Sequence, residues 1–257
     1  MAYSGYRPVQ DPVKVLKEKI EQDFIGAYLF WGEEEYLKNY YREQLKDKIR
    51  QEGMAEFNLV SVSFEKGAVI SEISDSLNTP PVMGAHKLVE VTGLDILSLK
   101  SAEEKQLVEA VESRADDTVL IFTFHSDELD LSTKKIRERK IIKELSEHVM
   151  TVEFPRQSRE KLLSWTDRIF TKESLHVSDV SIGKMIELCD YSMTRLRSES
   201  DKLVCRAKTE GIIEVPPDWI PLMIKPSAEN ETWEFCEAVM ARDKGKTAEI
   251  LALPWPI

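Results

Sequence analysis

The sequence predicts an α/β protein whose first domain contains a five-stranded parallel sheet and is followed by helical regions. Over the first 155 residues, short apolar and β-branched runs alternate with longer helical patterns. Such alternation is typical of a parallel sheet with helices on its faces. After "FPRQSREK" (154–161) only helical patterns follow. We therefore expect an α/β domain over 1–155, a three-helix domain over 156–213, and a linker with the beginning of a third, helical domain over 214–257.

The first domain is expected to open with a helix at "DPVKVLKEKIEQDF", where Asp11 is the N-cap and Pro12 lies in the first turn. The predicted strands are "AYLFW" (27–31), "FNLVSVSF" (57–64), "KLVEV" (87–91), "TVLIFTF" (118–124) and "VMTVEF" (149–154). The predicted helices between them lie near 34–52, 68–77, 101–114 and 132–147. The fourth strand is almost continuously apolar, which is typical of a strand that is buried on both faces of a sheet.

The second domain is predicted to contain three helices, at "REKLLSWTDRIFTKES", "SDVSIGKMIELCD" and "SMTRLRSESDKLVCRAK". Ser178 and Ser192 are expected as N-caps, and Gly211 is expected to end the third helix. The proline-rich stretch "EVPPDWIPLMIKPS" (214–227) predicts a linker. A further helical pair begins at "ENETWEFC", and we expect it to be the first part of a third domain that is cut short or packs on another subunit.

Composition narrows the class of protein. The chain is 42% hydrophobic and 32% charged, which is typical of a folded globular protein. It contains no run near the roughly 18 apolar residues of a membrane helix, and its start lacks the apolar core of a secretory signal. We therefore expect a cytoplasmic protein with no membrane partner. The net charge of −11 argues against a protein that grips DNA phosphates by itself, so any DNA contact is expected to be indirect, through partners.

The cysteines and the basic stretch both predict structural roles. Cys189, Cys205 and Cys236 are far apart and form no C-x-x-C pair, which predicts buried free thiols rather than a zinc site or a disulfide framework. The basic stretch "KKIRERKIIK" (134–143) contains isoleucines at helical spacing. It predicts a helix with one buried side and a solvated basic face, although such a stretch could also bind phosphate or an acidic partner.

The stretch "FWGEEEYLKNYY" (30–41) lies where a nucleotide-binding protein places its phosphate loop. Aligned from Gly32 with the template G-x-x-x-x-G-K-[ST], it has Leu37 at the second glycine, Lys38 at the lysine and Asn39 at the hydroxyl. Three glutamates, 33–35, occupy the path of the phosphates, where like charges repel. We therefore expect no nucleotide, metal or other cofactor. We interpret Lys38 as a solvated helix residue and the glutamates as groups that favour the positive helix end.

A five-stranded parallel domain followed by three helices resembles the two-part body of AAA+ ATPases. More specifically, the chain resembles the delta subunit family of the bacterial DNA polymerase III clamp loader, over roughly residues 15–245. The matching pieces, in family order, are "YLFWGEEEYL", "ISDSLNTPPVMGAHKLVEVTGLD", "DDTVLIFTFHSDELD", "VMTVEFPRQSREKLLSW", "SMTRLRSESDKLVCRA", "GIIEV" and "ENETWEFCEAVMARD". The resemblance implies an AAA+-like fold that has lost nucleotide binding.

The resemblance also implies a mechanical function. Members of this family bind the ring-shaped sliding clamp (the beta subunit) and hold one interface open, so that the ring can be placed around primed DNA. They act with the tau/gamma and delta prime subunits within the DNA-directed DNA polymerase complex, and no intrinsic catalysis is expected. The alternative function is that of an active AAA+-type ATPase with a divergent phosphate loop.

The clamp contact that the resemblance implies lies in "NTPPVMGAHK", at Val82 and Met83 with Pro81 beside them. The residues themselves point the same way, less specifically. Pro80 and Pro81 end the preceding helix and stiffen the turn, and Gly84 lets the chain reverse. An apolar pair on a rigid corner suits insertion into a partner's pocket. From the residues alone, an alternative stays open in which Val82 and Met83 pack under the sheet.

Overall fold

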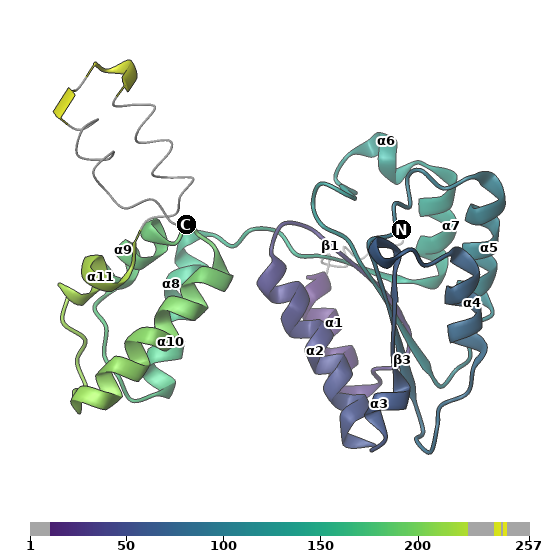
Figure 1. Ribbon diagram of the computed structural model, residues 1–257, viewed down its shortest axis with the longest axis horizontal. Helices are drawn as coiled ribbons and strands as arrows, with labels where there is room; N and C mark the ends of the chain where they lie inside the picture. Colours follow the sequence, from purple (N-terminus) through teal and green to yellow (C-terminus); the bar gives the residue numbers. More distant parts are fainter. Residues whose placement is uncertain (1–10, 226–238, 243, 246–257) are drawn as a thin grey trace, which may run out of the picture. The chain divides into compact units, whose positions relative to one another are not determined.

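The computed structural model describes residues 11–225, 239–242, 244 and 245. The chain divides into two compact units, with the boundary between Arg156 and Gln157 (Figure 1). The helical pair expected after residue 227 lies almost entirely outside the described residues, and so does Cys236.

The first unit contains a five-stranded sheet whose strands are all parallel and lie in the order β2-β3-β4-β1-β5. The strands are β1 (Ala27–Trp31), β2 (Leu59–Ser63), β3 (Lys87–Thr92), β4 (Thr118–Thr123) and β5 (Met150–Glu153). In the centre, Leu29 of β1 lies opposite Phe122 of β4 on one side and Thr151 of β5 on the other. The predicted fold class is confirmed.

The helices alternate with these strands and then continue into the second unit. In the first unit they are α1 (Pro12–Gln22), α2 (Glu35–Gln51), α3 (Ala55–Asn58), α4 (Ile70–Asn78), α5 (Ser101–Glu112), α6 (Lys134–Arg137) and α7 (Lys140–His148), with a 3₁₀ turn at Phe64–Lys66. In the second unit they are α8 (Arg159–Lys172), α9 (Asp179–Leu188), α10 (Met193–Glu210) and α11 (Trp219–Met223). Among the described residues, no helix is long and apolar enough to cross a membrane.

The sheet has a separate apolar core on each face. Successive side chains of a strand point to opposite faces, so Tyr28 and Phe30 of β1 join the core under α1 and α2, whereas Leu29 and Trp31 join the core under α4, α5 and α7 (Figure 1). Because helices cover both faces, the carboxyl ends of the strands are left as the open edge where this class of fold builds sites.

Two predicted elements of the first unit differ from the structure. Residues 57 and 58, predicted as the start of the second strand, belong to α3, and Asn58 turns inward there and bonds the backbone of Val82. The helix predicted over 132–147 is two helices, since Arg139 between them has an extended backbone with φ −61° and ψ 143°. This break sets the direction of α7, which buries Ile141 and Ile142 as predicted.

In the second unit the three predicted helices and their caps are observed. Ser178 and Ser192 accept backbone hydrogen bonds at the starts of α9 and α10, and Gly211 ends α10 with φ +67°. The segment predicted to be only a linker contains α11, whose Trp219 is buried and lies 3.9 Å from the Arg206 guanidinium. Proline does not prevent this helix, because at a helix start no backbone donor is lost.

The prediction of buried thiols holds for one of the two described cysteines. Cys189 is buried at the end of α9, and burial raises the pKa of its thiol to about 11. Cys205 is exposed, and the prediction was wrong there. The helical pattern alone did not tell which face of α10 position 205 would occupy.

Candidate functional site

The loop between β1 and α2, where a phosphate would bind, is occupied by the chain that follows β5. Phe154 donates its N–H to the carbonyl of Trp31 (2.8 Å), and its own carbonyl accepts the N–H of Glu34 (2.9 Å). Gly32 has φ +113°, and a Cβ atom there would lie 2.5 Å from the Phe154 carbonyl oxygen. A phosphate loop needs free backbone N–H groups. Here the protein uses the N–H of Glu34 for an internal bond.

Lys38 is fully buried, so its interpretation as a solvated residue was wrong. Its Nζ donates to the carbonyls of Gly32 and Phe124, both at 2.8 Å, and lies 2.5 Å from a carboxylate oxygen of Glu35. The first turn of α2 faces the carboxyl ends of β1 and β4, so a long side chain at this position reaches both strands. Lys38 therefore joins the two strand ends and has no further N–H to spare for a phosphate.

The other template positions are also used internally. Leu37, which stands where the second glycine would be, packs against the core under α1 and α2. Glu34 is the N-cap of α2, with a carboxylate oxygen 3.4 Å from the N–H of Tyr36, and burial raises the pKa of this carboxyl. Glu33 pairs with Arg156 at 2.8 Å. Glu34 thus provides the negative group that favours the positive end of α2.

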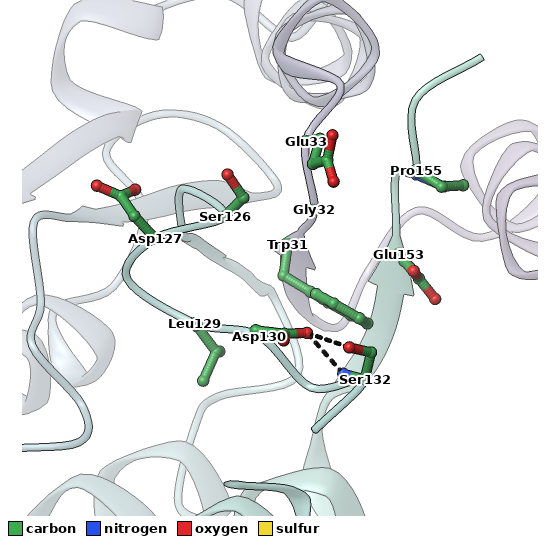
Figure 2. A pocket seen from close by; sticks show the side chains of 10 residues that line it. All are labelled: Trp31, Gly32, Glu33, Ser126, Asp127, Leu129, Asp130, Ser132, Glu153 and Pro155. Carbon is green, nitrogen blue, oxygen red and sulfur yellow. Dashed lines mark hydrogen bonds between the residues drawn. The ribbon is translucent and has the colours of Figure 1, made fainter. Parts of the chain in front are cut away.

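A depression of about 390 Å³ lies beside this loop, at the carboxyl ends of β1, β4 and β5. The ten residues that line it, shown in Figure 2, are Trp31, Gly32, Glu33, Ser126, Asp127, Leu129, Asp130, Ser132, Glu153 and Pro155. Four of them are carboxylates and none is a lysine or arginine. Asp130 accepts from the N–H and the hydroxyl of Ser132 (Figure 2), and these bonds lower its pKa.

The residues of this depression do not fit a nucleoside triphosphate. Four carboxylates would repel its phosphates, and the lysine that the template offers is engaged elsewhere. Among the described residues, no group of three His, Cys, Asp or Glu side chains is arranged to hold a metal ion.

A second candidate site lies at the amino ends of the strands, in the loop between α4 and β3. At this corner (residues 79–86) Val82 is 43% exposed and Met83 is 81% exposed, and Pro81 is half-buried. The alternative in which the apolar pair packs under the sheet is therefore wrong. Met83 has φ +51°, a backbone conformation that few residues other than glycine adopt.

The Asn58 side chain holds the backbone of the corner at Val82. It is completely buried; its Oδ1 accepts the N–H of Val82 (2.7 Å), and its Nδ2 donates to the Val82 carbonyl (3.0 Å). A Cβ atom on Gly84 would lie 2.7 Å from this Nδ2, so glycine is required for the close approach. Both backbone groups of Val82 are thus held in place while its side chain stays exposed.

Glu52 and Lys87 anchor the two ends of the corner. One carboxylate oxygen of Glu52 accepts the N–H groups of Ala85 (3.1 Å) and His86 (2.9 Å), and the other lies 2.5 Å from Nδ1 of His86. The buried Lys87 Nζ donates to the carbonyls of Ser76 and Thr79, at the end of α4. Burial lowers the pKa of Lys87. These bonds satisfy carbonyl groups that a helix end leaves without partners.

The sequence prediction missed Asn58, Glu52 and Lys87 as positioning residues. Their partners at the corner are up to 34 positions away along the chain, and no local pattern reports such a contact. Gly84, three residues after Pro81, was a local signal, since a glycine lets another segment approach the backbone closely.

The strand order, the helices on both sheet faces and the helical unit that follows in the chain define an AAA+-like protein. Its first strand–helix loop is filled by its own residues. Residues 28–155 match the sequence profile of the family described as "DNA polymerase III, delta subunit". The α/β unit of this chain belongs to the DNA polymerase III delta subunit family.

Solved structures support the fold. The Bacillus subtilis DNA clamp loader delta protein has 18% sequence identity and a TM-score of 0.62, with 93% of this chain and 70% of that chain covered. The Holliday junction branch migration motor RuvB of Thermotoga maritima has 10% identity and a TM-score of 0.55, covering 95% and 80%. Domain III of the Thermotoga maritima replication initiation protein DnaA has 13% sequence identity and a TM-score of 0.51, with 83% of this chain and 91% of that chain covered. At such identities the similarity shows the fold alone. No curated protein sequence matches the chain.

Proposed function

We propose that this protein is a clamp loader delta subunit that binds the sliding clamp, the beta subunit, through the corner at Pro81, Val82 and Met83 and holds the ring open. It acts by protein–protein contact in a complex with tau/gamma and delta prime subunits, and it reaches DNA through that complex. It does not hydrolyse ATP itself.

The observation that carries this proposal is an exposed apolar pair on a corner that other side chains hold rigid. Burying Val82 and Met83 in a partner's pocket contributes about 1.5–3 kcal/mol for each side chain. Asn58, Glu52 and Lys87 already hold the backbone, so little conformational entropy is lost on binding. Methionine also adapts well to the shape of a partner.

The absence of ATP hydrolysis is supported by the β1–α2 loop. Lys38 bonds two carbonyl oxygens of its own unit, Phe154 bonds the loop backbone, and carboxylates line the neighbouring depression. A divergent ATPase would need these groups to part before a phosphate could approach.

The proposal is tested by the affinity of the sliding clamp for the full chain, measured by surface plasmon resonance. We expect Val82→Ala/Met83→Ala to raise the Kd about tenfold or more, because each truncation removes apolar area from the contact. The control is Val180→Ala/Leu222→Ala, which truncates two exposed apolar residues of the second unit. Equal affinity for the wild type and the corner variant would refute the site.

Titration calorimetry with ATP and Mg²⁺ tests the proposal that the protein has no nucleotide site of its own. We expect no binding heat from the purified chain. Micromolar binding of ATP that depends on magnesium would contradict this proposal and favour the divergent ATPase.

A further inference from the structure

A second pair of exposed apolar side chains lies on the segment between α2 and β2. Met54 is 43% exposed and Phe57 is 57% exposed. Met54 precedes α3 with φ +50°, and its carbonyl accepts the N–H of Phe57 (3.1 Å), so this short turn is ordered by its own backbone bond. In the view of Figure 1, α3 lies at the lower end of the α/β unit.

This segment is attached to the corner at both of its ends. Glu52 bonds the backbone of Ala85 and His86, and Asn58 bonds the backbone of Val82. Met54 and Phe57 lie between these two attachment points. The Cα of Phe57 is about 3.8 Å from that of Asn58, as for any neighbouring residues. Residues 52–58 therefore run alongside residues 82–86.

The exposed apolar side chains of the two segments accordingly belong to one end of the unit. Asn58 is buried and Glu52 is half-buried, and both side chains bond the backbone of the corner, whereas the four apolar side chains are exposed. Exposed apolar side chains that gather in one region mark interaction surfaces. Aromatic residues are also enriched among the few residues that dominate binding energy, and Val82 and Met83 include none.

We propose that Met54 and Phe57 form one apolar docking surface with Val82 and Met83, and that Phe57 is its aromatic anchor on the sliding clamp. This inference rests on the proposed function, because it assigns the same partner to both segments. The reason is continuity: the two segments share Asn58 and Glu52, so a protein seated on the corner meets Phe57 as well.

The test compares Kd values for the sliding clamp and the full chain. We expect Phe57→Ser to raise the Kd about tenfold, as loss of an interface aromatic does. The matched control is Val69→Ser, because Val69 is 54% exposed in the same unit but lies at the start of α4, whereas the corner follows its end. Circular dichroism and the Tm of each variant verify that the fold is kept.

Failure of this inference differs from failure of the proposed function. If Val82→Ala/Met83→Ala weakens binding and Phe57→Ser does not, the shared surface is overturned and the corner remains the site. If neither variant weakens binding, the proposed function itself fails.

Hydrogen exchange of the wild-type chain gives a test that needs no variant. On addition of the clamp we expect slower amide exchange in both segments, 54–58 and 82–86. Slowing confined to the corner would overturn the inference, even if Phe57→Ser were too unstable to study.

Discussion

At the scale of single residues, Gly32 and Lys38 determine what the end of β1 can do. Gly32 is pressed against the Phe154 carbonyl at a φ that suits only glycine, and Lys38 spans from α2 to the ends of β1 and β4. Both positions match the phosphate-loop template in sequence. In the structure both positions serve internal contacts, because the Lys38 Nζ and the N–H of Glu34, which a phosphate would contact, are already bonded to groups of the same unit.

Replacement of Lys38 by methionine should destabilise the protein strongly. Lys38→Met keeps most of the side-chain volume but leaves the buried carbonyls of Gly32 and Phe124 without a donor, at a cost of about 1–3 kcal/mol for each buried unsatisfied group. We expect the free energy of unfolding, measured by chemical denaturation, to fall by about 2–6 kcal/mol.

The control for this change is Lys105→Met, at an exposed lysine of α5 whose ion pair within the described part of the chain is with Glu109 on the same helix. Its effect should stay within about 0.5 kcal/mol, as for other surface substitutions. Similar stability of the two variants would contradict the structural role of Lys38.

At the scale of elements, the corner is a junction of α3, α4 and β3 and belongs to none of them alone. Its exposed tip follows from Pro80 and Pro81, which local rules identify. Its backbone is held by Asn58 and Glu52, which lie on the segment before β2, and by Lys87 at the start of β3. Binding strength should therefore depend on residues that the partner does not touch.

Removal of the Asn58 side-chain amide tests this dependence. Asn58→Ala leaves the N–H and carbonyl of Val82 without partners, and we expect the free energy of unfolding to fall by about 1–3 kcal/mol. Clamp affinity should also fall, although Val82 and Met83 are unchanged, because the corner must be ordered on binding. Chemical denaturation and plasmon resonance give the two readouts.

Asn78→Ala is the matched control, since Asn78 is exposed on α4 and its side chain donates a long bond, 3.4 Å, to the Ser74 hydroxyl on the same helix. Both readouts should stay near the wild type there. If Asn58→Ala folds and binds the clamp as tightly as the wild type, pre-ordering of the corner has no role in binding.

At the scale of the whole molecule, the excess of acidic residues bears on DNA. The chain has 46 Asp and Glu against 35 Lys and Arg. In its most basic stretch, residues 134–143, Lys134 pairs with Glu138 and Lys140 pairs with Glu144 just beyond the stretch. The isolated protein therefore lacks the excess of positive charge that releases counterions from DNA phosphates.

We expect the isolated protein not to bind primed DNA at micromolar concentration and physiological salt, as measured by fluorescence anisotropy. Lys135→Glu/Arg137→Glu, which reverses two exposed charges of the basic stretch, should behave like the wild type. Micromolar binding that this variant removes would show that residues 134–143 contact DNA directly.

The sequence by itself determined the class of fold. The five strands and most helices were found because periods of two and of 3.6 residues are local properties, as are the serine caps and Gly211. It missed α3, the break at Arg139 and α11, where contacts with distant residues override the local pattern. The same limit explains why the exposure of Val82 and Met83, which the family resemblance pointed out, stayed open in the sequence.

Only the tertiary structure decided between the alternatives that the sequence left open. It buried Lys38, which a helical pattern treats like any other lysine, and it exposed the apolar pair at the corner. It also brought residues 52–58 alongside residues 82–86 through Glu52 and Asn58. The physical reason is the same in each case: burial and long-range hydrogen bonds depend on which segments meet in space, and a sequence pattern records only neighbours along the chain.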